Sequence, residues 1–430
     1  MPLKPNLSAL SPQNLPFDLS LLPQPAYIVG GCVRDALLGR THPYFDVDLV
    51  LPSDAVETAR QIAGYYNAGF VILDDVRRIA RVVFESGTVD LAQQMGKNLK
   101  ADLKRRDFRI NAIAYNPRTR KFIDPLKGRK DLEKRTIAAV SKANLEDDPL
   151  RLLRAYRQAA QLDFTIDPKT RTFLAKLAPN LAKISAERVR QELSYLLAAP
   201  KGDRWLRAAY EDGVLPIWLQ NAKKKSIKQI DEIDRVAWLL GTIWQDFAES
   251  LRRPVGNSTS GLTLAKLAAL VSPNLEKARS QLEALTYSRN EIRFVLTILQ
   301  HHHPILSLVD APMRLEDQYF FFQEVGDVFP ALAVFGVAKA ACRDIIEENQ
   351  ATNAIAPLVN AYLDPDNQAA HPTPLISGND LIRSLGLRPS PAIGQLLTRL
   401  QLARVTGQIA TPEEALQLAA TLIASSPSFQ

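Results

Sequence analysis

Two aspartates in the segment FDVDLV are spaced so that they could bind one metal ion together. Side chains two residues apart on a strand share a face, so Asp46 and Asp48 fall on one side while the apolar residues around them face the core. Two neighbouring carboxylates repel each other unless a cation lies between them, and their hard oxygen atoms suit Mg²⁺. The alternative is a solvated face of an edge strand. Asp90, in TVDLA, could be a third carboxylate at the metal, but the favoured interpretation is a supporting or exposed residue.

A glycine-rich turn, GGCVRD at residues 30–35, precedes this pair and favours the metal interpretation. Glycines such as Gly30 and Gly31 let backbone N–H groups approach a phosphate closely, and the start of a helix adds partial positive charge. Arg34 could pair with a phosphate oxygen. An ordinary tight turn between a strand and a helix also uses two glycines, so this signal is weak by itself.

A third candidate is the basic run LKADLKRRDFRINA at residues 99–112. The guanidinium groups of Arg105 and Arg106 suit a phosphate, and Asp107 could pair with a ribose hydroxyl. A charged strand edge is an equally good interpretation of these residues taken alone.

The segment DDPLRLLRAYR places one acid and three arginines at spacings of three residues: Asp148, Arg151, Arg154 and Arg157. On a helix such residues follow one slowly rotating face. That face is too polar for a core, so it could read the edge of a nucleobase and hold a triphosphate. A surface helix with ordinary salt bridges is the alternative.

The sequence offers little support for a histidine metal site, a disulfide framework or other common catalytic motifs. Three consecutive histidines in HHHP, residues 301–304, cannot share one helix face, so a cluster near a helix end is favoured over a metal site. Cys32 and Cys342 lie far apart and outside any ligand-spaced motif, which favours a reducing cytoplasm over a disulfide framework. The sequence has no Ser–His–Asp pattern, no P-loop and no GxGxxG motif.

The elements that must position these residues change character along the chain. Up to about Val140, short runs of β-branched residues alternate with helical patterns, which predicts a small α/β unit. From about Glu146 onward the pattern is almost wholly helical, with predicted helices over DDPLRLLRAYRQAAQL, from Ser185 to Leu197, and beyond. Prolines in residues 1–24 predict an extended leader without a helix. The fold class is therefore α+β.

Composition and charge narrow the class of partner. The chain has 430 residues and a formal net charge of +7, which hints at a polyanionic partner. Residues 97–135 hold fourteen Lys/Arg against five Asp/Glu, whereas residues 301–430 hold seven against thirteen. We find neither a signal peptide nor a run approaching the roughly 20 apolar residues of a membrane span, so we expect a cytoplasmic protein without membrane contact.

Six motifs in order now resemble those of the bacterial-type (class II) tRNA nucleotidyltransferase and poly(A) polymerase family. The resemblance runs from about Ala26 to Pro200, and PLISGNDLIRSLGLRPSPAIGQLL resembles a C-terminal helical segment of the same family. The motifs are GGCVRD, FDVD, RRDFRINA, DPLKGRKDL, EDDPLRLLRAYR and ISAERVRQEL.

The resemblance implies a polymerase-beta-like nucleotidyltransferase head and all-α neck, body and tail. After the leader at 1–24, the implied boundaries are 25–140, 141–200, 201–300 and 301–430. Asp46 and Asp48 would bind Mg²⁺ and be catalytic, in a two-metal attack of the tRNA 3′-hydroxyl on the α-phosphorus. The binding partners of the protein would be the acceptor end of tRNA and the nucleotide. The implied nucleotide-binding residues are Gly31, Arg34, Arg154 and Arg157 at the triphosphate, Arg106 and Asp107 at the ribose, and Asp148 with Arg151 at the base. Gly30 and Asn111 would also belong to the nucleotide-binding site.

One departure from the family pattern points to a subgroup. Enzymes that add complete CCA resemble one another in a longer flexible stretch before the RRD motif, whereas here only Leu91–Leu103 separates TVDLA from it. This shortening resembles the CC-adding subgroup, so we expect CTP to be the substrate. Addition of A, of complete CCA or of poly(A), with ATP as a substrate, is the alternative.

Two other classes of function stay open. A non-catalytic RNA-binding module would explain the basic region but not the paired carboxylates. A second-messenger or antibiotic nucleotidyltransferase would need no long helical half. The oligomeric state is not predicted by the sequence.

Overall fold

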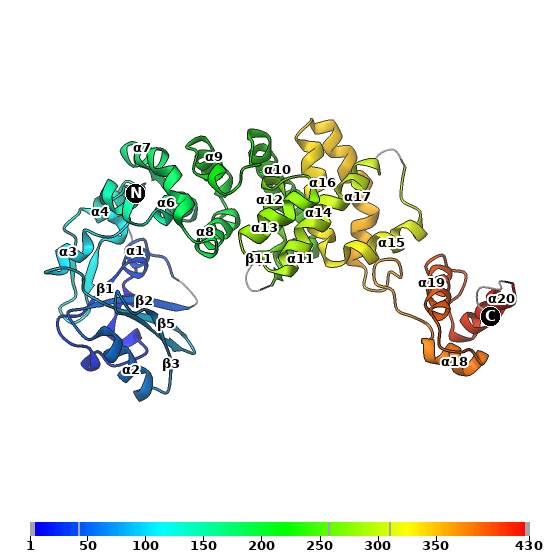
Figure 1. Ribbon diagram of the computed structural model, residues 1–430, viewed down its shortest axis with the longest axis horizontal. Coiled ribbons are helices and arrows are strands. Elements are labelled where there is room, and N and C mark those ends of the chain that lie inside the picture. The colour runs from blue at the N-terminus through cyan, green and yellow to red at the C-terminus, as the bar shows by residue number, and fades with distance from the viewer. Residues whose placement is uncertain (1–4, 42–43, 257–258, 309–310, 426–430) are drawn as a thin grey trace. The chain divides into compact units, whose positions relative to one another are not determined.

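The computed structural model describes residues 5–41, 44–256, 259–308 and 311–425. Contacts within the chain divide it into two units, Met1–Trp218 and Leu219–Gln430. The first unit combines a β-sheet with helices, and the second is almost entirely helical (Figure 1), which confirms the predicted α+β class. The finer division into a leader and four modules stays a prediction.

A seven-stranded sheet organises the first unit in the order β3-β4-β5-β2-β1-β6-β7. Strand β2 runs parallel to β5, and the other neighbours are antiparallel. Helix α2 (Ala55–Tyr65) covers one face with small and apolar residues including Ala59 and Ile62. The strands are β1 Tyr27–Val29, β2 Phe45–Leu51, β3 Gly69–Asp74, β4 Ile79–Phe84, β5 Gly87–Gln93, β6 Ala114–Asn116 and β7 Lys121–Ile123.

The N-terminal segment corrects one expectation, because the described residues 5–24 are not an extended leader. Prolines do prevent a long helix, but the segment folds into three short 3-10 turns that pack on the sheet unit. Leu10, Phe17 and Leu22 are buried, and burial of apolar side chains between the prolines is what holds the segment in place. The turns are Ser8–Leu10, Pro12–Asn14 and Leu19–Leu21.

Helices between the sheet and Trp218 begin and end close to the predicted residues. Helix α6 (Leu150–Leu162) ends at Asp163, which adopts the left-handed conformation common at helix ends. Ser185 occupies the N-cap of α8 (Ala186–Ala198), although its side chain makes no capping hydrogen bond. The remaining helices of this unit are α1 Gly31–Leu37, α3 Leu99–Leu103, α4 Gly128–Glu133, α5 Lys142–Asp147, α7 Pro168–Leu177 and α9 Gly202–Glu211.

Helix α16 (Phe329–Ala341) lies in an apolar core of the second unit, and its residues are nearly all buried. A separate cluster joins the last three helices through residues such as Leu381, Leu400 and Ala415. The helices of this unit are α10 Lys224–Ile243, α11 Gln245–Arg252, α12 Gly261–Leu270, α13 Leu275–Ala284, α14 Arg289–Ser307, α15 Leu315–Val325, α16, α17 Ile345–Leu363, α18 Gly378–Leu385, α19 Pro391–Val405 and α20 Pro412–Ser425.

One segment of this unit, Leu315–Ala341, is long and apolar enough by composition to cross a membrane. The sequence prediction that no such run exists therefore needs correction. The segment comprises α15 and α16 with a short turn between them, and 72% of its most apolar window is buried inside the protein. Helix α16 reaches this composition because nearly all of its residues are buried, whereas α15 keeps an exposed side.

The histidine run lies in the last turns of α14, and His302 is the buried member. Its Nδ1 donates to the carbonyl oxygen of Leu299 (2.9 Å), and its Nε2 accepts from the ammonium group of Lys339 (2.6 Å). Burial lowers the pKa of His302 to about 4, and the positive charge of Lys339 adds to this effect. Within the described ranges, no group of three or more His, Cys, Asp or Glu could hold a metal ion, so His302 is a neutral core residue.

This arrangement predicts a stability loss in mild acid that depends on His302. Between pH 6.5 and about 4 the unfolded chain binds a proton at this residue that the folded protein does not, so the free energy of unfolding falls as the pH drops. We expect a loss of up to about 3 kcal/mol by pH 4. Urea unfolding at pH 7, 5.5 and 4.5 should show a smaller loss for His302→Gln than for the unmodified protein. An equal loss in both proteins would contradict this prediction, and His371→Gln is the control, because its ring contacts Tyr362 instead.

Candidate functional site

Asp46 and Asp48 lie on β2 with the geometry that the sequence predicts. Their side chains alternate with buried Val47 and Leu49 along the strand. Asp46 is exposed and accepts a hydrogen bond from the hydroxyl of Thr88 (2.8 Å), whereas Asp48 is half-buried. Burial raises the pKa of Asp48 to about 6; the charge of Arg106 opposes this rise, and the neighbouring carboxylates add to it.

The turn between β1 and α1 is shaped to fit against Asp48. Gly30 has a φ of +77°, and a Cβ atom placed there would lie 2.5 Å from Oδ2 of Asp48 and 3.4 Å from Nη1 of Arg106. Only glycine avoids both the strained backbone and this collision. The sequence motifs GGCVRD, FDVD and RRDF therefore meet at one point in the folded chain.

Asp90 is paired with an arginine. It lies opposite Asp48 on β5, and its carboxylate accepts two hydrogen bonds from Arg81 at 2.6 and 2.9 Å. With Asp90 engaged in this way, the described part of the chain offers a metal ion two carboxylates and no third ligand group. Such a donor set fits Mg²⁺, which is commonly held by one or two carboxylates together with substrate phosphates and water.

Beside the carboxylates, Arg34 extends from α1 to Asn111. Its guanidinium group donates to both carboxylate oxygens of Asp35 at 2.9 Å and to Oδ1 of Asn111 at 2.9 Å. Asn111 is buried, and its amide nitrogen donates to Asp107 and to Gln158, each at 2.9 Å. The amide thereby fixes the direction of the Arg34 side chain.

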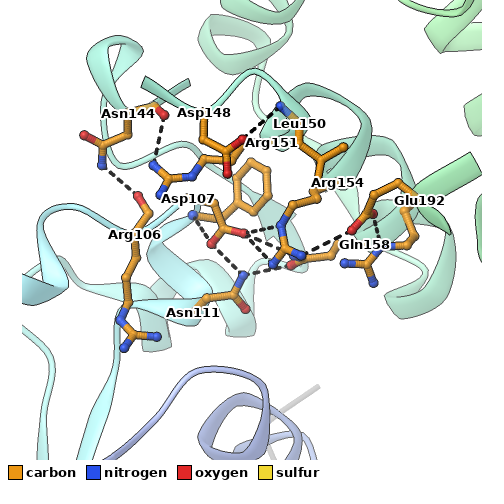
Figure 2. A network of polar contacts seen from close by, with 12 residues as sticks. Arg106, Asp107, Asn111, Asn144, Asp148, Leu150, Arg151, Arg154, Gln158 and Glu192 are labelled. Carbon is orange, nitrogen blue, oxygen red and sulfur yellow. Dashed lines mark hydrogen bonds and ion pairs between the residues drawn. The ribbon is translucent and has the colours of Figure 1, made fainter. Parts of the chain in front are cut away.

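Asp107 is the buried centre of this polar network (Figure 2). It is 7% exposed and accepts hydrogen bonds from Arg154 (2.9 and 3.0 Å), Asn111 (2.9 Å) and the backbone of Phe108 (2.7 Å). Burial alone would raise the pKa of Asp107, but the charge of Arg154 and these hydrogen bonds lower it to about 2. Asp107 is therefore an ionised carboxylate whose main contacts lie within the protein.

Two arginines of α6, Arg154 and Arg157, form ion pairs with acidic side chains rather than lying on an open face. Glu192 of α8 lies between Arg154 (3.3 Å) and Arg157, and forms an ion pair with each. The Arg154 side chain stays 33% exposed, whereas that of Arg157 is 14% exposed. Sequence reasoning missed Glu192, although an acid among Val189, Leu193 and Leu196 on the buried stripe of α8 is a signal for a buried cationic partner.

Asp148 and Arg151 lie where α5 meets α6. Asp148 follows α5 and precedes Pro149, so it lies just outside the helix that carries the three arginines. Its carboxylate accepts from Nη2 of Arg188 at 3.0 Å, a contact that the sequence did not predict. Nη1 of Arg151 donates to the backbone carbonyl of Asn144 at 2.9 Å.

Two further groups define what the site can do chemically. Nε of Arg106 is buried without a hydrogen-bond acceptor among the described residues, although the guanidinium group lies 3.6 Å from Asp102. The thiol of Cys32 lies close to Asp48, and burial together with the nearby carboxylates raises its pKa to about 12. A thiol that stays protonated is not a nucleophile, so the carboxylate pair and the surrounding arginines are the reactive features.

Three family profiles match consecutive parts of the chain. Residues 26–138 match the poly A polymerase head domain, residues 163–225 match the RNA and SrmB-binding site of polymerase A, and residues 257–420 match the tRNA nucleotidyltransferase domain 2.

Relatives and a solved structure resemble the chain over most of its length. It is 46% identical to a CC-adding tRNA nucleotidyltransferase of Synechocystis sp., covering 95% of this chain and 96% of that protein. It is 30% identical to a CC-adding tRNA nucleotidyltransferase of Geobacter sulfurreducens, covering 91% and 90%. The fold is similar to that of a CCA-adding enzyme in complex with ATP, with a TM-score of 0.68, 22% identity and coverage of 94% and 90%.

Proposed function

Because the chain belongs to the bacterial-type (class II) tRNA nucleotidyltransferase family, we propose that this enzyme adds two cytidines, CC, to the 3′ end of tRNA with CTP as donor. The two relatives described above, at 46% and 30% identity, are both CC-adding enzymes. We expect the reaction to take place in the cytoplasm, with the acceptor end of tRNA bound to the basic part of the chain.

The observation that carries the CC proposal is the short connection before the RRD motif. Strand β5 ends at Gln93 and α3 begins at Leu99, so few residues lie between them. Two hydrogen bonds fix this connection. The backbone N–H of Met95 donates to the carboxylate of Asp102 (3.0 Å), and the side-chain oxygen of Asn98 caps α3 by accepting from the N–H of Ala101 (3.0 Å). The connection therefore holds no long flexible loop, the feature that the family resemblance associates with the change from CTP to ATP.

In the proposed mechanism Asp46 and Asp48 would hold Mg²⁺ through their paired carboxylates. A bound Mg²⁺ would lower the pKa of the tRNA 3′-hydroxyl and neutralise charge on the departing pyrophosphate. The 3′-hydroxyl oxygen forms a bond to the α-phosphorus of CTP as the bond to pyrophosphate breaks. The turn at Gly30 and Gly31 packs directly beside Asp48, where its backbone N–H groups would approach the phosphates.

The other residues of the proposal bind and orient the nucleotide. Arg34 and the exposed side of Arg154 would hold the triphosphate, with Arg157 supporting Arg154 through Glu192. Arg106 would meet the ribose, and Asp107 would act there by fixing Arg154 and Asn111. Asp148 and Arg151 would pair with the base.

The test is a product analysis with a tRNA transcript that lacks its last three nucleotides. We expect CTP alone, and CTP together with ATP, to give a product two nucleotides longer and no further extension. A transcript that already ends in CC should stay unextended with ATP, and ATP alone should give no poly(A). A terminal adenosine after CC would refute CC-only addition, and absence of any incorporation with Mg²⁺ would favour a non-catalytic RNA-binding protein.

A further inference from the structure

Asn144 lies between the two segments that the proposed function assigns to the ribose and to the base (Figure 2). Its amide nitrogen donates to the backbone carbonyl oxygens of Lys104 (2.8 Å) and Arg106 (2.7 Å). Its amide oxygen accepts from the hydroxyl of Ser141 (2.8 Å). A primary amide offers two N–H groups and an acceptor oxygen, and every one of these groups has a partner here.

The backbone of the same residue contacts the segment proposed to read the base. The carbonyl oxygen of Asn144 accepts from Nη1 of Arg151 (2.9 Å) and from the backbone N–H of Asp148 (3.3 Å). Asn144 therefore contacts the turn that carries Arg106 through its side chain, and both proposed base-reading residues through its backbone.

The turn at Lys104 and Arg106 needs such a partner. It follows the C-terminus of α3, where the carbonyl groups receive no hydrogen bond from within the helix and need donors from elsewhere in the chain. The carboxamide of Asn144 supplies two of these donors across 38 to 40 residues of sequence. The position of the turn, and with it the direction of Arg106, is set from α5.

We infer that Asn144 is a positioning residue that couples the ribose side of the nucleotide site to its base-reading side. This inference rests on the proposed function. Asn144 itself need not touch the nucleotide, because it acts through the turn at Arg106 and through Arg151. The coupling predicts that the choice of base and the choice of sugar depend on this one side chain.

Two substitutions test the coupling. Asn144→Asp keeps the size of the side chain and its acceptor oxygen. It replaces the amide nitrogen, which donates both hydrogen bonds, with an oxygen that would face the carbonyl oxygens of Lys104 and Arg106. Asn144→Ala removes the side-chain contacts altogether. We expect kcat/KM for CTP to fall about tenfold for Asn144→Ala and about a hundredfold for Asn144→Asp. Both variants should fold, since Ser141 still caps α5 by accepting from the backbone N–H of residue 144 (3.1 Å).

The deciding measurement is selectivity. The ratios of kcat/KM for CTP over UTP and for CTP over dCTP, measured on tRNA lacking its CCA end, should both fall at least about fivefold in each variant. A variant that was merely unstable would lose active enzyme and thus lower all rates equally, so the ratios would not change. Asn116→Asp is the matched control, because Asn116 serves the β6–β7 turn by accepting from the N–H groups of Arg118 and Thr119.

The outcomes separate this inference from the proposed function. Unchanged ratios in active Asn144 variants would overturn the inference and leave the proposed function intact, and a fall in only one ratio would overturn the coupling. If the unmodified enzyme adds no cytidine to tRNA, the proposed function fails and the inference falls with it. Parallel falls in both ratios, with the Asn116→Asp control unchanged, would support it.

Discussion

Asp48→Asn is expected to slow cytidine addition by at least about a thousandfold without lowering the stability of the enzyme. The substitution removes a charged ligand from the proposed Mg²⁺ site. It also removes a carboxylate whose charge is unfavourable in the folded protein, because burial raises the pKa of Asp48. The free energy of unfolding at neutral pH should therefore stay the same or increase slightly. Asp46→Asn should give a loss of rate of the same order.

Single-turnover incorporation of labelled CTP into tRNA, with thermal unfolding measured in parallel, would check this. Asp90→Asn is the matched comparison, since Asp90 lies opposite Asp48 on the neighbouring strand and pairs with Arg81. We expect its rate to fall less than about tenfold. A loss as large as that of Asp48→Asn would make Asp90 a third metal ligand, and full activity of Asp48→Asn would remove the carboxylate pair from the mechanism.

Asp107→Asn should have the largest effect on stability. The carboxylate is buried and ionised, and four hydrogen bonds from Arg154, Asn111 and Phe108 end on it. An amide of the same size keeps one acceptor oxygen but leaves Arg154 without its closest counter-charge and places N–H groups against other donors. We expect a loss of about 2–4 kcal/mol in the free energy of unfolding.

The carboxylate of Asp107 also makes the free energy of unfolding depend on pH in acid. The pKa of Asp107 is lowered to about 2, so its contribution to stability is complete above the unfolded pKa near 4 and is lost as the pH falls from there to about 2. Asp107→Asn should lack this acid-dependent part, amounting to about 2 kcal/mol. Denaturant unfolding between pH 7 and 2.5 measures it, and identical acid curves for both proteins would contradict the assignment. Asp163→Asn, in an exposed pair with Lys201, should change stability far less than Asp107→Asn.

Local sequence patterns predicted the parts of the site that lie on single elements. The alternation in FDVDLV placed Asp46 and Asp48 on one strand, and Asp163 and Ser185 lie at the helix boundaries expected for them. Each of these predictions depends on residues only a few positions apart. Periodicity and capping preferences act at that range.

Predictions failed or were incomplete where distant residues decide the outcome. The interpretation of Arg154 and Arg157 as an open ladder missed Glu192, which is 35 residues or more away in sequence. The helical sequence pattern from Ile227 to Leu251 is interrupted in the structure at Trp244, which has an extended backbone and donates a hydrogen bond from its indole to Asn360. Hydrophobic periodicity carries no information on such contacts.

The close approach of Gly30 to Asp48 also limits how this enzyme can change during evolution. Any side chain at position 30 would collide with the carboxylate that is proposed to bind the metal, so the two positions cannot vary independently. A larger residue at position 30 would force the carboxylate of Asp48 to shift and would strain the backbone, so it would disturb the proposed chemistry. Selection for the proposed catalysis would therefore also act on this glycine, although it has no reactive group of its own.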